Sequence, residues 1–359
     1  MTRQPLAADV AGVGRLALDA MSGLTDVVES MHGTIARRPL PFGGRGETRT
    51  RGITRFVYQT IRAVTHVTGA SFDAAVSAIG ADPTAHATSP RRDAIVSALN
   101  GVLGDHLAAT GNPLAIAMQL RRREHPTTAR ALVLVHGLCM TDQQWLRDGR
   151  DHGAALAAAG WTPSYVRYNT GCAIATNGRE LSEQLEQLVA GWPLPLDELA
   201  IIGHSMGGLV ARSACDHARS AGHAWLARLA KLVCLGTPHH GAPLERAGNL
   251  LEMLVGVSPY AAPIARLGGI RSAGIKDLRF GIQAPLPERV ACFAIAGRRG
   301  RLLGDGLVPV ASALGHHDDP RLALAFPRAH QHVIDDCDHL ELLSSPAVFA
   351  RIAGWLDQS

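Results

Sequence analysis

From residue 131 onward, short and continuously aliphatic runs alternate with longer amphipathic segments. Continuous apolarity is typical of strands that are buried on both faces. Strands that alternate with helical segments indicate a parallel sheet with crossover helices on both faces. Ligands of such open sheets bind beyond the carboxyl ends of the strands, so the residues that end these runs are the first functional candidates. The runs occupy residues 131–137, 199–205, 231–238, 290–297 and 331–339.

The first third of the chain follows a different pattern, in which apolar residues recur at helical spacing. Such stretches begin near Val10, Ile53 and Ile95, and the segments that join them are rich in proline, glycine, arginine and threonine. We therefore predict a helical N-terminal extension over residues 1–112 and an α/β catalytic domain over residues 113–359. We interpret the apolar stripes of the extension as packing faces, because its residues form no catalytic constellation in the sequence.

The second aliphatic run ends in Gly203-His204-Ser205-Met206-Gly207, and a helical segment follows it. This is the pattern G-x-S-x-G, in which glycines allow a sharp strand-to-helix turn and a strained centre residue exposes its hydroxyl. The amino end of the following helix stabilises negative charge that forms beside that hydroxyl. The sequence therefore predicts that Ser205 is a nucleophile.

A serine nucleophile requires a base, and the base requires an orienting acid. In this architecture the acid and then the histidine follow the serine along the chain. Asp305 lies in a loop after the fourth run and His339 follows the fifth, so we predict Asp305 as the acid and His339 as the base. We expect His330 and His332 at the opposite end of the last strand. The competing acids, which are turn residues or too close to His339 in sequence, are Asp318, Asp319, Asp335, Asp336 and Asp338.

An oxyanion needs two backbone N–H donors, of which one usually comes from the residue after the nucleophile and one from the loop after an earlier strand. The first position is Met206. The second is Leu138, because His136-Gly137-Leu138 ends the first aliphatic run. We interpret His136 itself as a structural loop histidine.

Several motifs together resemble the α/β-hydrolase superfamily, in particular the bacterial esterase/lipase group and the lipase-like domain of GPI inositol-deacylase-type proteins. The resemblance covers about residues 113–359 and implies the α/β-hydrolase fold, a mostly parallel doubly wound sheet. The motifs are HGL at 136–138, GHSMGG at 203–208, GTPHHG at 236–241, GDGLVP at 304–309 and DHLELL at 338–343.

The resemblance assigns the same roles to Ser205, Asp305 and His339 and to the amides of Leu138 and Met206. It places residues 236–241 at the border of the site. His239 or His240 therefore contacts substrate or stabilises the loop, and both interpretations stay open. No cofactor and no metal is expected, because most of this group use none. The six cysteines also lack the spacing of metal ligands.

Residues 242–287 do not continue the alternation of aliphatic runs with amphipathic segments. They carry an apolar helical face that begins at Leu250. An insertion at this place would stand over the strand ends, so we predict a helical cap or lid that supplies an acyl pocket. A helical insertion that is packed against the domain and does not move fits the same residues.

Charge and hydropathy limit the partners that we expect. No apolar stretch approaches the length of about 20 residues that spans a bilayer, and acidic and basic residues interrupt the N-terminal segment, so we predict a cytoplasmic protein. Arginines cluster between Arg37 and Arg55 and could touch an anionic membrane surface. The stripes of residues 1–112 could instead bury themselves against the catalytic domain or a second copy of the chain. Aromatic residues at 4% are too sparse for nucleic-acid stacking.

The function expected from these residues and motifs is hydrolysis of a carboxylic ester of acyl or lipid type through an acyl-serine intermediate. A thioesterase or an acyltransferase would use the same three residues, since these enzymes differ only in the leaving group or the acceptor. The alternative outside catalysis is a lipid-binding or scaffold protein on a hydrolase fold. That protein would carry a broken triad, whereas all three residues are present in this sequence.

Overall fold

The structure of the protein is a computed structural model. It describes residues 90–241, 272–300 and 304–358, a helical piece at residues 11–19, and the single residues 9, 22 and 59. The arginine cluster and most of the expected cap, residues 242–271, lie outside the described residues.

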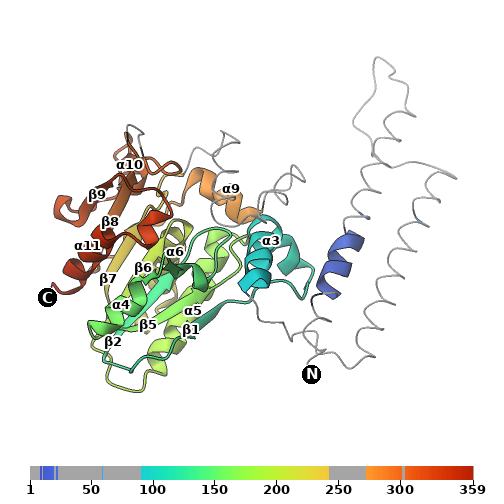
Figure 1. Ribbon diagram of the computed structural model, residues 1–359, viewed down its shortest axis with the longest axis horizontal. Helices are drawn as coiled ribbons and strands as arrows, with labels where there is room; N and C mark the ends of the chain where they lie inside the picture. Colours follow the sequence, from blue (N-terminus) through green and yellow to red (C-terminus); the bar gives the residue numbers. More distant parts are fainter. Residues whose placement is uncertain are drawn as a thin grey trace, which may run out of the picture. The chain divides into compact units, whose positions relative to one another are not determined.

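A seven-stranded sheet forms the centre of the larger part (Figure 1). Its strand order is β1-β5-β2-β6-β7-β8-β9, and all pairs are parallel except β1 with β5. The predicted mostly parallel, doubly wound sheet is thereby confirmed. The strands are β1 Gln119–Arg122, β2 Arg130–Val135, β5 Thr162–Arg167, β6 Glu198–His204, β7 Leu229–Leu235, β8 Ala291–Arg298 and β9 Gln331–Asp335.

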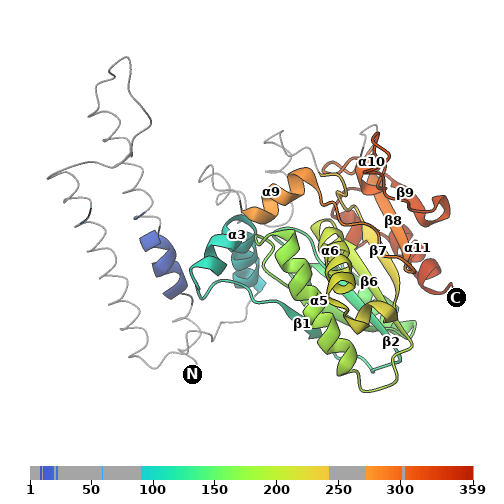
Figure 2. The same cartoon turned by 180° about the vertical axis from the view of Figure 1, so that it is seen from behind.

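Helices cover both faces of this sheet, and Figures 1 and 2 show the two faces in turn. Alternate residues of β2 enter two different cores, because side chains of a strand point to opposite faces. Val133 and Val135 pack with residues of α5 and α6, and Leu132 and Leu134 pack with residues of α4 and α11. The described helices are α3 Pro90–Ala109, α4 His152–Ala158, α5 Ile174–Ala190, α6 Met206–Ala221, α9 Ala273–Phe280, α10 Val310–Ala313 and α11 Pro346–Leu356.

Strands β1 and β5 were not predicted from the sequence. β5 is buried along its whole length, but Pro163, Ser164 and Arg167 interrupt the aliphatic pattern that marks the other buried strands. β1 carries the sequence QLRR and lies at the edge of the sheet. Their residues therefore lack the hydrophobic signal on which the other strands were recognised.

The chain divides into two compact units, residues 1–89 with 109–114 and residues 90–108 with 115–359. In the smaller unit, the side chain of Asn112 donates a hydrogen bond to the carbonyl of Gly12 (3.0 Å). Most of helix α3 belongs to the larger unit, although the sequence analysis placed it with the N-terminal extension. A domain boundary at residue 112 stays a prediction, because most residues before it lie outside the described part.

All predicted site residues follow the carboxyl ends of parallel strands. Leu138 comes after β2, Ser205 directly after β6 and His239 after β7. Asp305 follows β8, and His339 follows β9. Because the carboxyl ends of parallel strands meet at one edge of a sheet, segments far apart in sequence converge there.

Candidate active site

Ser205 sits at the tip of a sharp turn between β6 and α6. Its backbone lies in the left-handed region, with φ of 53° and ψ of −125°, which is uncommon for a residue other than glycine. The turn is so tight that a Cβ on Gly203 would lie 2.5 Å from the nitrogen of Gly208, and a Cβ on Gly207 would lie 2.2 Å from the carbonyl oxygen of Val135. The glycines of the motif are therefore required by close backbone approach, as the pattern predicts.

Asp305 and His339 form a buried hydrogen-bonded pair. Oδ2 of Asp305 lies 2.7 Å from Nδ1 of His339, and the two residues are 1% and 4% exposed. The other oxygen, Oδ1, accepts hydrogen bonds from the backbone amides of Leu307 (3.0 Å) and Val308 (2.8 Å). The carboxylate therefore holds the proton of the imidazole on Nδ1 and leaves Nε2 as the basic nitrogen.

His204 joins this pair to the serine turn. Its Nε2 donates a hydrogen bond to the carbonyl oxygen of His339 (2.9 Å), and the two rings lie 4.8 Å apart. A Cβ on Gly236, at the end of β7, would lie 3.1 Å from Oδ2 of Asp305 and 3.2 Å from Nδ1 of His339. The residue directly before Ser205 thus touches the expected base, although among the described residues no hydrogen bond joins the Ser205 hydroxyl to the His339 ring.

Two amides are available beside the serine. Gly137 approaches Ser205 so closely that a Cβ on it would lie 3.0 Å from Cβ of the serine, and Leu138 is the next residue. Met206 opens helix α6, where the first backbone N–H groups lack partners within the helix. In the described part of the chain, neither the Leu138 nor the Met206 amide donates to another protein atom. Both amides therefore have the free donor that an oxyanion site requires.

We call residues 136–140 the oxyanion loop, and contacts from the segment directly after β5 hold it. Tyr168 donates its hydroxyl to the carbonyl oxygen of His136 (2.7 Å), and their rings stack at 4.5 Å. Cys139 has φ of 59°, and its amide donates to the side chain of Thr170 (3.0 Å). Burial lowers the pKa of His136 to about 3, so its ring stays neutral near pH 7, in agreement with the predicted structural role.

Helix α3 packs directly against this loop through small residues. A Cβ on Gly101 would lie 2.0 Å from Sγ of Cys139, so glycine allows the helix to reach the loop. One turn later, the carbonyl oxygen of Gly104 accepts a hydrogen bond from the side chain of Asn169 (2.8 Å). The hydroxyl of Ser272, which caps α9, donates to the carbonyl oxygen of Gly101 (2.7 Å). α3 is therefore a wall of the site region, a role that its sequence did not predict.

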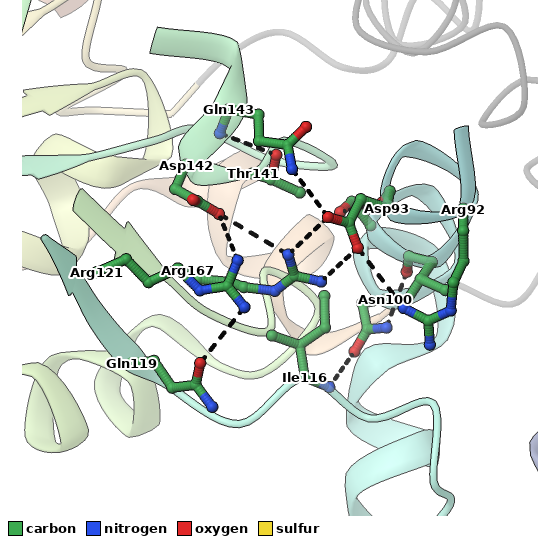
Figure 3. Close-up of polar contacts among 12 residues, drawn as sticks. Arg92, Asp93, Asn100, Ile116, Gln119, Arg121, Thr141, Asp142, Gln143 and Arg167 are labelled. Carbon is green, nitrogen blue, oxygen red and sulfur yellow. Dashed lines mark hydrogen bonds and ion pairs between the residues drawn. The ribbon is translucent and has the colours of Figure 1, made fainter. Parts of the chain in front are cut away.

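A buried ion pair fixes the start of α3 to the sheet (Figure 3). Arg167 of β5 donates from both terminal nitrogens to the two carboxylate oxygens of Asp93, at 3.0 and 3.1 Å. The side chain of Gln143 donates to the same carboxylate (2.9 Å), and Asp142 lies 3.9 Å from Arg167. Asp142 and Gln143 begin a short 3-10 helix, which Thr141 caps directly after the oxyanion loop. This cluster therefore links α3, β5 and the segment after the oxyanion loop.

The two histidines of the GTPHHG motif have different surroundings. His239 is completely buried, its Nδ1 accepts a hydrogen bond from Arg212 (3.0 Å), and its ring lies 5.3 Å from that of Phe326. His240 is half-buried, and its amide donates to the hydroxyl of Ser312 (3.2 Å). The contacts of His239 are those of a packing residue, and substrate contact by either histidine stays a prediction.

The competing residues lie where the sequence analysis expected them. Nδ1 of His330 lies 3.1 Å from the carbonyl oxygen of Cys292, near the start of β8 and thus at the opposite end of the sheet. Asp335 pairs with Arg298 at the surface, at 2.6 Å. In the part of the chain that the structure describes, no group of three or more histidine, cysteine or acidic side chains is placed to hold a metal ion.

Residues 127–262 match the family described as the PGAP1-like alpha/beta domain. The matched segment contains Ser205 and the oxyanion loop, and it ends before Asp305 and His339. The predicted resemblance to lipase-like α/β-hydrolases is confirmed by this match together with the fold. No curated protein matches the chain.

Solved structures of bacterial and archaeal lipases and esterases are similar in fold. The mature Bacillus licheniformis lipase BlEst2 is 20% identical, with 67% of this chain and 98% of that chain covered and a TM-score of 0.47. The Staphylococcus hyicus lipase is 14% identical, with 66% and 98% covered and a TM-score of 0.43. The Pyrococcus furiosus esterase Pf2001 is 14% identical, with 67% and 92% covered and a TM-score of 0.41.

Proposed function

We propose that the protein is a serine hydrolase that cleaves a carboxylic ester of acyl or lipid type through an acyl-serine intermediate. The observation that carries the proposal is the buried Asp305–His339 hydrogen bond, which His204 connects to the strained Ser205 turn. A nucleophile, an oriented base and free amide donors at one edge of a sheet are the parts that acyl transfer requires.

In the proposed first half-reaction, Oγ of Ser205 attacks the ester carbonyl carbon and its proton passes to Nε2 of His339. Asp305 stabilises the imidazolium that forms, because its carboxylate contacts Nδ1. The amides of Leu138 and Met206 donate to the oxyanion of the tetrahedral intermediate. When the intermediate collapses, the alcohol leaves with the proton from His339, and the acyl group remains on Ser205.

In the second half-reaction, His339 takes a proton from water and the hydroxide attacks the acyl carbon. The same two amides stabilise the second tetrahedral intermediate. Its collapse releases the carboxylic acid and returns the proton to Ser205, so the enzyme is regenerated without a cofactor or any change in oxidation state.

Covalent labelling with a fluorophosphonate tests this proposal. The reagent should label the protein at Ser205, and Ser205→Ala should lose both labelling and esterase turnover. Ser220→Ala is the matched control, because Ser220 lies on the same helix and bonds only to the carbonyl oxygen of Asp216 at the surface. Labelling that persists in Ser205→Ala would show that another residue is the nucleophile.

A thioesterase or an acyltransferase would give the same labelling, so the leaving group has to be tested separately. A panel of acyl esters, acyl-thioesters and lipids distinguishes these activities by their relative kcat/KM. The lipid-binding or scaffold alternative predicts no labelling and no turnover with any member of the panel. We expect turnover to be fastest with esters.

Contact with an anionic membrane through residues 1–112 stays a prediction, and the arginine cluster lies outside the described residues. No helix in the described portion of the chain is long and apolar enough to cross a bilayer. Co-sedimentation with anionic liposomes at low salt tests peripheral binding. The comparison variant should be deleted only as far as residue 89, because α3 packs on the oxyanion loop. Equal sedimentation of both proteins would exclude docking through the deleted segment.

A further inference from the structure

The structure contains a cavity whose described walls include none of the five residues assigned to ester cleavage. Its volume is about 510 Å³, within the usual range for small-molecule pockets. Its described walls come from α6, from the segments 280–286 and 317–325, and from the GTPHHG motif. Neither the three residues of the proposed triad nor the two oxyanion residues line it.

Arg212 forms the buried inner wall of this cavity. The side chain is 1% exposed, and it donates one hydrogen bond to Nδ1 of His239 (3.0 Å) and another to the carbonyl oxygen of Ala284. Within the described residues, no carboxylate forms an ion pair with it, and its Nε has no acceptor. Burial lowers the pKa of Arg212 to about 10, so the guanidinium remains charged near pH 7. A buried charge without a counter-ion is unfavourable unless an anion joins it.

His239 adds a second donor at the same place. Because Nδ1 of His239 accepts from Arg212, the proton of its neutral ring is on Nε2, and this buried nitrogen has no acceptor. Burial and the neighbouring guanidinium keep the pKa of His239 well below its ordinary value. Arg212 and His239, which line the cavity, therefore carry a single positive charge and two fully buried N–H groups that lack acceptors.

The remaining walls are apolar and reach the surface. Phe280 is 73% exposed and Leu322 is 41% exposed, and both line the cavity together with Ile282, Leu286 and Leu324. None of the described lining residues is acidic. The lining Arg321 already pairs with Asp319 (2.6 Å), so its charge is compensated.

We propose that this cavity binds a single-chain amphiphile with a carboxylate head group, such as a medium- or long-chain fatty acid. A carboxylate supplies one negative charge and two acceptor oxygens, which match one guanidinium and two N–H groups without acceptors. The hydrocarbon chain covers the apolar walls and removes the exposed Phe280 and Leu322 from water. A phosphate monoester fits less well, because its second negative charge has no partner on the inner wall.

Binding at this site needs no catalysis, so it can be tested apart from the proposed function. The full-length protein carrying Ser205→Ala is titrated calorimetrically with decanoate, decanol, decyl phosphate and acetate, each below its critical micelle concentration. We expect decanoate to bind at least tenfold more tightly than decanol or decyl phosphate, and acetate not to bind. Equal affinity for decanol would show that the carboxylate charge does not contribute to binding. Tighter binding of decyl phosphate would overturn the assignment of a carboxylate.

Variants of the cavity decide where decanoate binds. Arg212→Gln keeps an N–H donor for Ala284 but removes the charge, and Ala323→Trp fills the cavity from a lining residue near its exposed edge. Each of these two variants should bind decanoate at least tenfold more weakly than the unmodified cavity does. Arg219→Gln, on the exposed side of the same helix, is the matched control and should bind normally. Thermal melts check folding, and if Arg212→Gln does not fold, Ala323→Trp decides alone. Unchanged affinity in Ala323→Trp would overturn the site.

A further arm separates this cavity from an acyl pocket at Ser205. Wild-type protein whose serine has been blocked by fluorophosphonate should still bind decanoate with unchanged affinity. Loss of binding after the block would show that decanoate occupies the catalytic site instead.

Discussion

The Ser205 turn and the oxyanion loop lie side by side, but different parts of the sequence determine them. The turn is fixed from within, because Gly203, Ser205 and Gly207 supply its tight approach and its strained dihedral angles. The oxyanion loop is fixed from outside, by Tyr168 and Thr170 and by helix α3. A short motif therefore contains what shapes the first region, whereas the HGL pattern locates the second region without recording the tertiary contacts that hold it.

The largest effect expected from this comparison is loss of the base, which leaves both regions intact. His339→Ala should lower kcat on the order of 10⁴-fold or more, since removal of one triad member disables the whole unit. Steady-state kinetics with an activated ester measure it. His332→Ala is the control and should change turnover little, because His332 lies within β9 and not at its carboxyl end. The reverse ranking would show that the last strand is misassigned.

The next effect concerns the ion pair between Asp93 and Arg167, which fixes helix α3 to the sheet beside the oxyanion loop. Asp93→Ala leaves Arg167 buried without its bidentate partner, and loss of one member of a buried pair costs about 3–5 kcal/mol. We expect the free energy of unfolding, measured in urea, to fall by this amount.

The double variant Asp93→Leu/Arg167→Met is the control for this ion pair. It removes both charges, so it should recover most of the lost stability. A small loss in Asp93→Ala, below about 1 kcal/mol, would mean that Asp142, at 3.9 Å from Arg167, compensates the guanidinium alone.

A smaller effect tests whether helix α3 positions the oxyanion loop, as distinct from stabilising the fold. Gly101→Ala should displace Cys139, because the added Cβ would lie 2.0 Å from its Sγ. We expect kcat to fall about tenfold with little change in KM, since misplaced amides weaken only the transition state. Alanine raises helix propensity by about 1 kcal/mol, which offsets part of the cost of this clash, and a thermal melt shows whether the variant still folds.

Cys139→Gly should rescue Gly101→Ala. It removes the colliding side chain and suits φ of 59°, so the double variant should regain most of the lost kcat. Unchanged kcat in Gly101→Ala itself would show that α3 does not position the loop.

The last effect is a pH dependence of stability that comes from the oxyanion loop and builds up gradually, one pH unit at a time. The pKa of folded His136 is about 3, below the ordinary value near 6.5, because burial disfavours the charged ring. The unfolded chain therefore binds more protons between these values, and stability falls as pH drops below about 6.5, by up to about 1.4 kcal/mol per pH unit. Urea titrations from pH 7 to 4 should show a shallower slope in His136→Asn. An identical slope would mean that His136 has the same pKa in the folded and the unfolded chain.

The difference between the two regions also explains what the sequence could predict. Five strands carry aliphatic runs, so these strands could be predicted, and the residues after them, including Asp305 and His339, could be expected at one edge of the sheet. β5 was missed because Pro163 and Ser164 interrupt it. The part played by α3 was missed because its contacts use Gly101 and Asp93, which leave no hydrophobic pattern.

The strand order has a consequence for how the chain folds. The serine turn needs β6 and β7, because the amide of Ser205 donates to the carbonyl oxygen of Leu235, but the acid and the base follow β8 and β9, which extend the sheet on one side. Parallel pairings between distant segments form slowly, because loop closure precedes the contacts that reward it. We therefore expect reactivity toward a fluorophosphonate during refolding to return only after β8 and β9 have paired, since Ser205 has neither acid nor base before then.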